Sequence, residues 1–381
     1  MTFETSSKIV SGEGQLKNIS NLLEDRGFKH PAILCDQNLY ESSEYVKTCI
    51  ADLQEELDLV LFFYDYPFEP SYQFIDKLNQ KIQGHPRRKE IDCWVGIGGG
   101  SSMDSAKVLA ILAKNGGKAI KYKGFPEDLN DPLPVICVPS TTGTGSEVVF
   151  NASLIDEDTK IKMGVNYKKN YPVLAILDPK IVSGAPLSVL SSSGCDALVH
   201  CLESFVSPVK TNESRMFSTM AFNLIMENMP SLLESKGDIK NWLNMQWAAV
   251  FAMYGLSNSS SGPAAALSYY LGTNFKINHG VAGAIFIGKV SRFNHEHGFY
   301  DYSDLYNGSE ANLSKQERSL HVVDSIEGLL RLADIPESLV ELGVKETDLE
   351  GFCDFRVEVD AAFKMNPVNI DKSDLMEKIL I

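Results

Sequence analysis

The residue pair in this sequence that is best suited to metal chemistry is Asp196 and His200, which are four positions apart. The surrounding segment has helical periodicity, so both side chains are expected to project from one face of a helix. A carboxylate and an imidazole arranged in this way can chelate a divalent ion. Such pairs also occur on protein surfaces and in cores without an ion, so the spacing alone leaves both interpretations open.

A glycine-rich turn is the second candidate for chemistry. The segment Val95–Lys107 places Gly98, Gly99, Gly100 and Ser101 between an apolar run and a helical pattern. Glycines permit a tight turn and let backbone N–H groups approach a pyrophosphate at a helix N-terminus. The spacing differs from the G-x-G-x-x-G fingerprint of dinucleotide sites, so a glycine-rich turn without a ligand remains an alternative.

A polar loop follows the next predicted strand, in the segment Pro139–Glu147. Its hydroxyl-bearing residues are Thr141, Thr142, Thr144 and Ser146, with Ser140 beside them. Hydroxyls and exposed amides at the carboxyl end of a strand suit a ligand crevice in an α/β sheet. A solvated Ser/Thr turn is the alternative.

These loops need a parallel sheet to hold them in place. Short apolar runs alternate with amphipathic segments through the first half of the chain, which predicts a parallel sheet covered by helices on both faces. The expected strands are 31–36, 59–63, 91–97, 134–139 and 175–178. The expected helices between them include 45–57 and 72–82.

The pattern changes at about residue 184, beyond which helical periodicity dominates. The expected helices are 195–206, 214–234, 239–254 and 320–332. His295 and His297 are assigned to a surface loop between two of these segments. We therefore predict an α/β domain at 1–183 and an all-α domain at 184–381.

Composition limits the classes of function. The 35 basic and 50 acidic side chains give a net charge of −15, which argues against a nucleic acid as the main partner. No uninterrupted apolar stretch is long enough for a transmembrane helix, and the N-terminus lacks a signal-peptide pattern. The seven cysteines are scattered without CxxC spacing, which suits a reducing cytoplasm. We expect a cytoplasmic protein that interacts with neither membranes nor nucleic acid.

The order of several motifs resembles that of the iron-containing (group III) alcohol dehydrogenase family. The motifs are GGGSSMD at 98–104, PSTTGTGSEV at 139–148, the segments 160–164, 175–179 and 194–205, Leu271-Gly272 and His279-Gly280. The resemblance covers nearly the whole chain. It implies the dehydroquinate synthase-like architecture, with an NAD(P)-binding domain at 1–183, a helical metal and substrate domain at 184–381, and NAD(P) in the cleft between them.

The resemblance also implies roles for the two loops. Gly98, Gly99, Gly100 and Ser101 would hold the pyrophosphate. The hydroxyl-bearing residues Thr141, Thr142, Thr144 and Ser146 would line the adenine and nicotinamide sides. Lys162 would reach the ribose, and Asp104 would lie near the cofactor in an orienting role.

Asp36 ends the first strand, where the family places the residue that contacts the adenosine ribose. A carboxylate accepts hydrogen bonds from the ribose hydroxyls and repels a 2′-phosphate. NAD is therefore favoured over NADP.

The metal site is where this chain departs from the family pattern. The resemblance implies Asp196, His200 and His279 as ligands of a divalent metal, zinc or iron(II). The remaining family histidine aligns with Ala265, fourteen residues before His279, and a methyl group cannot coordinate a metal. Three ligands resemble an open catalytic zinc site. The alternative is that metal binding is weak or lost.

The expected catalytic residues are Asp104, Tyr269 and His279. Tyr269 stands where the family often has a further histidine, and it could serve in a proton relay or pack on the substrate. The polar segment 258–261 precedes the altered helix, and its amide and hydroxyls are a hypothetical binding surface for a polar substrate.

The resulting prediction is an NAD-dependent oxidoreductase that interconverts a polar alcohol and its aldehyde or ketone by metal-assisted hydride transfer. By analogy with divergent family members, the substrate would belong to a sugar-acid or phosphonate-aldehyde pathway. The alternatives are a catalytically inactive NAD-binding homologue and a dehydroquinate synthase-like lyase. The family resemblance also suggests a homodimer.

Overall fold

The computed structural model describes residues 5–58, 60–64, 69–235, 237–308 and 312–381. These residues form two compact units, Thr5–Ala185 and Pro186–Ile381. The first is an α/β unit and the second is helical, which confirms the predicted fold class. The assignment of 1–183 to NAD(P) and of 184–381 to metal and substrate remains a prediction.

A six-stranded sheet forms the centre of the α/β unit, and all of its neighbouring strands are parallel. Its strand order is β1-β8-β5-β4-β2-β3. The strands are β1 (Lys8–Ser11), β2 (Pro31–Asp36), β3 (Val60–Tyr64), β4 (Cys93–Gly98), β5 (Val135–Pro139) and β8 (Leu174–Leu177). Five of them match the expected strands, except that residue 59 lies outside the described residues. The edge strand β1 was not predicted.

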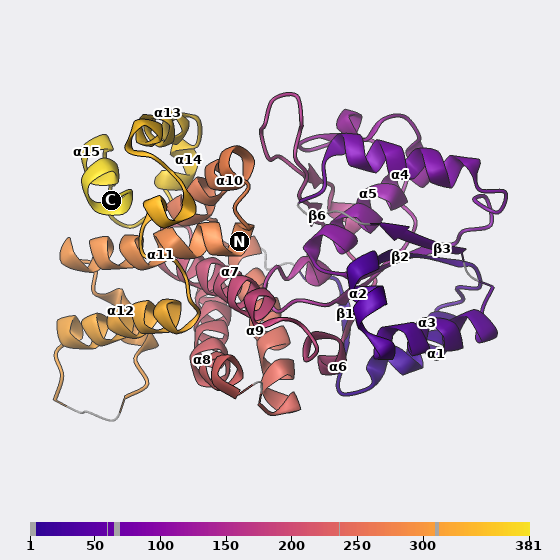
Figure 1. The fold of residues 1–381 in the computed structure, drawn as a ribbon, viewed down its shortest axis with the longest axis horizontal. Helices are drawn as coiled ribbons and strands as arrows, with labels where there is room; N and C mark the ends of the chain where they lie inside the picture. The colour runs from indigo at the N-terminus through magenta and orange to yellow at the C-terminus, as the bar shows by residue number, and fades with distance from the viewer. Residues whose placement is uncertain (1–4, 59, 65–68, 236, 309–311) are drawn as a thin grey trace. The chain divides into compact units, whose positions relative to one another are not determined.

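Helices cover both faces of this sheet (Figure 1). Helices α4 (Tyr72–Gly84) and α5 (Gly100–Asn115) pack on one face, and α1 (Ile19–Glu24) and α3 (Glu44–Glu56) pack on the other. Side chains alternate along β2, so that Ala32 and Leu34 join the first layer while Ile33 and Cys35 join the second. The strands are thus buried on both sides, which explains why they appear in the sequence as continuous apolar runs.

Short elements complete the α/β unit. Helices α2 (Gln37–Ser42) and α6 (Pro179–Val182) follow β2 and β8. A small antiparallel pair, β6 (Asn151–Ala152) and β7 (Val165–Asn166), lies outside the main sheet.

The helical unit is built around α7 (Leu187–Val206). From Gly194 to Val206 every residue of α7 is buried, and the helix contacts α8, α9, α10 and α11. The other helices are α8 (Asn212–Ser235), α9 (Ile239–Ser257), α10 (Pro263–Phe275), α11 (His279–Glu296), α12 (Lys315–Leu332), α13 (Leu349–Glu358), α14 (Asp360–Phe363) and α15 (Lys372–Asp374). The four expected helices lie within α7, α8, α9 and α12.

The assignment of His295 to a surface loop was wrong. His295 lies in the last turn of α11, where it is buried and its Nδ1 lies 2.9 Å from Ser319 Oγ. His297 follows directly as the C-cap of the same helix. Both imidazoles have partners inside the protein, since His297 Nδ1 lies 2.8 Å from the carbonyl oxygen of Phe293, so a polar segment of the sequence forms the end of a packed helix.

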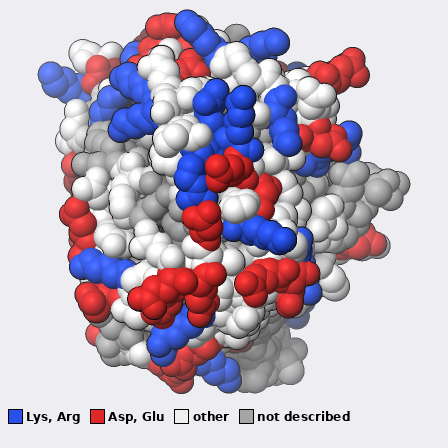
Figure 2. Space-filling view, turned by 90° about the vertical axis from the view of Figure 1, so that its right-hand side faces the viewer, with Lys and Arg blue, Asp and Glu red and all other residues white. Residues whose placement is uncertain are grey.

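No helix in the described ranges combines the length and the apolar composition needed to cross a bilayer. On the face shown in Figure 2, the described basic and acidic side chains lie interspersed instead of forming a continuous basic band.

Gly280 lets α11 approach α7 closely, and its replacement tests this packing. A Cβ at Gly280 would lie 1.9 Å from the carbonyl oxygen of Ser192 in α7. We expect Gly280→Ala to lower the free energy of unfolding of the helical unit by about 1–3 kcal/mol, measured by urea denaturation.

Gly328→Ala is the matched control, because a Cβ at Gly328 in α12 would meet nothing within 4 Å. Its higher helix propensity should stabilise the protein by up to about 1 kcal/mol. Equal effects of the two alanines would show that close helix approach is not the constraint at Gly280.

Candidate functional site

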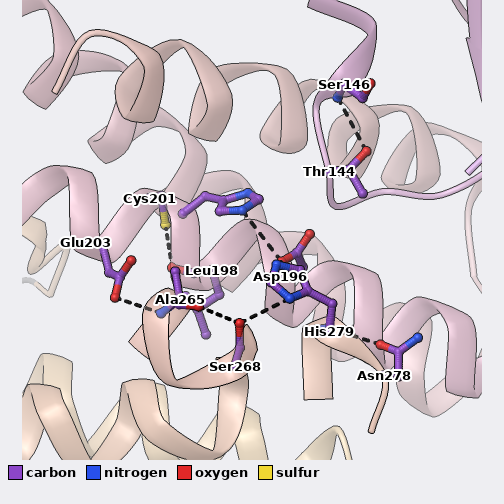
Figure 3. A network of polar contacts seen from close by, with 12 residues as sticks. Thr144, Ser146, Asp196, Leu198, Cys201, Glu203, Ala265, Ser268, Asn278 and His279 are labelled. Carbon is purple, nitrogen blue, oxygen red and sulfur yellow. Dashed lines mark hydrogen bonds and ion pairs between the residues drawn. The ribbon is translucent and has the colours of Figure 1, made fainter. Parts of the chain in front are cut away.

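Three potential metal ligands converge in the helical unit. Asp196 Oδ1 lies 3.6 Å from His200 Nε2 and 3.8 Å from His279 Nε2. The three ligand atoms lie within 4.8 Å of one another, and Asp196 and His200 are buried. Asp196 and His200 extend from α7. His279 is the first residue of α11, and Figure 3 shows it beside Asp196.

The spacing of these atoms fits a small divalent ion. Ligands at about 2.1 Å from a tetrahedral zinc ion lie about 3.4 Å from one another, close to the two distances measured from Asp196 Oδ1. His200 Nδ1 is buried and has no hydrogen-bond partner among the described residues. One carboxylate and two imidazoles form a ligand set suited to zinc or iron(II). The residues present therefore fit the expected metal.

His279 is held by two residues of α10. Its Nδ1 lies 3.1 Å from Ser268 Oγ. The Tyr269 ring is stacked on the imidazole, with ring centroids 5.3 Å apart and an interplanar angle of 6°. Tyr269 thus lies at the site, and its role as packing group or proton relay remains a prediction.

Ala265 occupies the first turn of α10, where its backbone makes two contacts. Its N–H donates to Glu203 Oε1 at 3.0 Å, and its carbonyl accepts a hydrogen bond from Ser268 Oγ at 2.6 Å. The structure therefore connects Ala265 to the site through its peptide groups, while its side chain offers no ligand atom.

Glu203 anchors the beginning of α10, and the sequence analysis assigned it no role. Its carboxylate accepts hydrogen bonds from Gly262 N at 2.7 Å, Ala264 N at 2.7 Å and Ala265 N at 3.0 Å. The N-cap Gly262 has no side chain, so Glu203 provides from α7 the cap that α10 lacks. Burial raises the pKa of Glu203 to about 7, although the three N–H donors act in the opposite direction.

The signal for Glu203 was present in the sequence. A glutamate three residues after His200 on an otherwise apolar helix must be buried, and a buried carboxylate needs donors. The sequence could not show that those donors come from a helix end far along the chain, such as Ala264, which lies 61 residues after Glu203.

The glycine turn lies at the carboxyl edge of the parallel sheet. Gly98 has a φ of +149°, and a Cβ there would lie 1.9 Å from Ser102 Oγ. A Cβ at Gly100 would lie 3.0 Å from Thr144 Cγ2, and one at Gly99 would lie 3.4 Å from Thr141 Cγ2. The two predicted cofactor loops are therefore in contact, and the contact depends on the missing side chains.

The N-terminus of α5 is the feature of this turn that suits a phosphate. Helix α5 begins at Gly100, and its N-cap Gly99 provides no side-chain hydrogen bond. Uncapped N–H groups and the helix dipole favour an anion at this end. Ser101 lies in the first turn. Binding of a pyrophosphate by Gly98–Ser101 remains a prediction.

Asp104 and Ser146 belong to a buried polar network. Asp104 accepts hydrogen bonds from Ser146 Oγ and from Ser153 N, and it pairs with Lys107 at 3.3 Å. Lys107 Nζ also donates to the carbonyls of Ser146 and Asn151 at 2.7 and 2.9 Å. The network fastens α5 to the segment after β5, so both predicted cofactor residues already have internal partners.

Asp36 and Lys162 also have partners within the protein. Asp36 Oδ1 accepts a hydrogen bond from Leu39 N at 2.8 Å and caps α2. Lys162 forms an ion pair with Glu69 at 2.7 Å. Asp36 lies beside the glycine turn, since a Cβ at Gly98 would lie 3.3 Å from the Asp36 Cβ. Thr141 Oγ1 is buried and has no hydrogen-bond partner among the described residues. Thr142, in the same loop, is also buried.

The polar segment 258–261 follows the end of α9. Asn258 is the C-cap and donates through Nδ2 to the carbonyl of Tyr254 at 2.9 Å. Ser259 Oγ donates to the carbonyl of Gly255 at 3.0 Å and lies 2.9 Å from Ser204 Oγ. These contacts account for the polar residues as a helix end, and substrate binding by this segment remains a prediction.

Two protein-family models match the chain. The model of iron-containing alcohol dehydrogenases matches residues 6–179, and the C-terminal model of the Fe-containing alcohol dehydrogenase family matches residues 190–380.

Named relatives agree with these matches. Alcohol dehydrogenase 4 of Schizosaccharomyces pombe is 30% identical over 94% of this chain and 83% of its own length. The NAD-dependent methanol dehydrogenase of Bacillus methanolicus is 28% identical over 90% of this chain and 89% of its own. Among solved structures, an alcohol dehydrogenase from Oenococcus oeni has the same fold, with a TM-score of 0.90 at 23% identity over 99% of this chain and 98% of that one.

Removing the charge of Glu203 tests whether it anchors α10. A glutamine keeps one acceptor oxygen but turns an NH₂ group towards the N–H groups of the helix end. We expect Glu203→Gln to lower the free energy of unfolding by about 1–3 kcal/mol, measured by urea denaturation.

Glu227→Gln on the exposed face of α8 is the matched control, with an expected change within about 0.5 kcal/mol. A Glu203→Gln protein as stable as this control would contradict the anchoring role.

Proposed function

The chain belongs to the iron-containing alcohol dehydrogenase family, and from this premise we propose that it is an NAD-dependent oxidoreductase that interconverts a small alcohol and its aldehyde or ketone. The observation that carries the proposal is the convergence of Asp196, His200 and His279 on one point of the helical unit. The chain thus has a group of potential ligand atoms of the kind that a metal-dependent alcohol dehydrogenase needs.

Asp196, His200 and His279 would hold the metal, and iron(II) and zinc both suit them. The Glu203 carboxylate holds the N-terminal end of α10, the helix that carries Ser268 and Tyr269, and both of these contact His279. The protein thereby fixes the orientation of a ligand that comes from outside α7.

NAD would bind at the carboxyl edge of the parallel sheet. Gly98, Gly99 and Gly100 leave room for a pyrophosphate at the N-terminus of α5, and the hydroxyl-bearing loop at 141–146 lies against them. The name of the Bacillus methanolicus relative includes NAD dependence, which supports the same cofactor here. When bound, the metal would act as a Lewis acid on the substrate oxygen, and the nicotinamide would accept or donate the hydride.

The substrate would be small and polar. Homodimer formation and a cytoplasmic location remain predictions from the family resemblance and the composition. A sugar-acid or phosphonate-aldehyde pathway likewise remains a proposal by analogy.

One observation favours a second candidate function, a catalytically inactive NAD-binding homologue. Ala265 leaves the site with three ligand residues, and fewer ligands weaken metal binding. Metal content and NADH production together separate the two functions.

Metal analysis of protein purified without chelator is the direct test. We expect near-stoichiometric iron or zinc in the wild type and its loss in Asp196→Asn, which removes the charge that both imidazoles face. His279→Gln should likewise lose the metal. Its control for nonspecific metal uptake is His321→Gln, which removes an exposed histidine of α12. With a panel of short alcohols, the metal-containing enzyme should form one NADH per aldehyde.

Ala265→His completes this experiment, because it adds the imidazole that the family pattern has at this position. A wild type that is empty and inactive, beside an Ala265→His protein that binds metal, would establish the inactive homologue. Product formation without net NADH would instead indicate the lyase.

Asp36→Ser tests the cofactor preference without removing the helix cap. Serine is as good an N-cap as aspartate, so α2 should keep its cap while the negative charge is lost. Hydrogen bonds to a charged group contribute about 1.5–3 kcal/mol, so the preference for NAD over NADP, measured as a ratio of kcat/KM, should fall about 10- to 100-fold. An unchanged ratio in a protein of unchanged melting temperature would exclude Asp36 from ribose recognition.

A further inference from the structure

Ser268 lies between a backbone carbonyl and a candidate metal ligand. Its side chain is fully buried, with Oγ 2.6 Å from the carbonyl oxygen of Ala265 and 3.1 Å from His279 Nδ1 (Figure 3). A serine hydroxyl has one proton to donate and lone pairs that accept. The direction of the two hydrogen bonds therefore determines where the proton of His279 lies.

The carbonyl of Ala265 can only accept, so the short contact to Ser268 requires the hydroxyl proton to point at it. With its proton used there, Ser268 Oγ can only accept at the second contact. His279 Nδ1 must therefore donate. In a neutral imidazole the other nitrogen, Nε2, then carries a lone pair and no proton, and Nε2 is the atom that lies 3.8 Å from Asp196 Oδ1.

We propose that Ser268 is a positioning residue that holds His279 in the Nδ1–H tautomer and so directs the Nε2 lone pair to the ligand cluster. The proposal rests on the proposed function for its consequence, metal binding, but the tautomer itself is a property of the metal-free protein.

The acceptor that orients Ser268 is itself fixed. The N–H of Ala265 donates to Glu203, and the carbonyl of the same residue receives the Ser268 hydroxyl. Ala265 thus contributes a rigid acceptor to the arrangement around His279, at the position where the family pattern has a ligand. Its side chain has no part in this role.

His200 provides an internal contrast. Its Nδ1 has no hydrogen-bond partner among the described residues, so nothing comparable selects its tautomer. The tautomer of His279 is selected by Ser268, and the stacked Tyr269 ring restricts rotation of the imidazole. Partners of this kind, which contact a ligand residue and not the metal, typically change metal affinity 10- to 100-fold when mutated.

The first measurement is the tautomer of His279 in metal-free protein labelled with ¹⁵N-histidine. Long-range ¹H–¹⁵N spectra at a pH where imidazoles are neutral distinguish Nδ1–H from Nε2–H, and loss of one signal set in His279→Gln assigns the residue. We expect Nδ1–H in the wild type and a shift towards Nε2–H, the form that free histidine prefers, in Ser268→Ala. A wild-type His279 in the Nε2–H form, or a Ser268→Ala protein with an unchanged spectrum, would overturn the proposal.

The second measurement is the zinc affinity of the same proteins by competition with a chelator. Ser268→Ala should weaken zinc binding about 10- to 100-fold. Ser268→Thr, which keeps the hydroxyl, should restore the affinity and the Nδ1–H spectrum. An unchanged affinity in Ser268→Ala would also overturn the proposal.

Ser319→Ala is the matched control, because Ser319 is a fully buried serine that lies 2.9 Å from the Nδ1 of His295 in the same helical unit. It loses an equivalent Ser–His contact and should bind zinc like the wild type. A wild type that binds no zinc would refute the proposed metal site alone, and the spectra of the metal-free proteins would still decide the role of Ser268.

Discussion

The carboxylate of Glu203 is the interaction on which the arrangement of the helical unit's site depends. It accepts three N–H groups at the beginning of α10, an end whose N-cap is a glycine. From there the contacts continue through the peptide of Ala265 to Ser268, and through Ser268 to His279. His279 then faces Asp196, which returns to α7, the helix of Glu203. Three helices are thus joined in a closed series of polar contacts, and each contact is made by a buried or half-buried group that has lost water.

The α/β unit arranges its candidate site in another way, by omitting side chains. The approach of the glycine turn to the threonine loop requires the absence of a Cβ atom at Gly100, and the turn itself requires the absence of one at Gly98, where it would meet Ser102. Polar side chains beside this turn are used to hold the backbone: Asp36 caps α2, and Asp104 and Lys107 fasten α5 to the next loop. A ligand at this edge would therefore meet backbone N–H groups and hydroxyls presented by a framework that its own buried charges hold in place.

Much of this fold could be predicted from the sequence, because strands that are buried on both faces leave continuous apolar runs and α7 leaves a long apolar segment. Strand β1 was not predicted because it is a four-residue edge strand whose end residues Lys8 and Ser11 are exposed, so it lacks the continuous apolar run of the buried strands. His295 was misplaced because its burial depends on Ser319, a partner outside its own segment. Asp196, His200 and His279 could be grouped only through the resemblance, as the spacing of two residues on one helix does not identify a third on another. Glu203 and Ser268 escaped notice for the same reason: the partners that define them are distant in sequence or lie in backbone groups.

The dual use of Ala265 has a consequence for how such a site can evolve. Its N–H and its carbonyl support the neighbours of the site, and every residue type except proline supplies both groups. The side chain at position 265 is therefore released from the architectural task and can be exchanged by selection without rebuilding the helix that carries it. A substitution at position 265 would therefore change the number of candidate ligand side chains while both backbone hydrogen bonds stay available to the neighbouring residues.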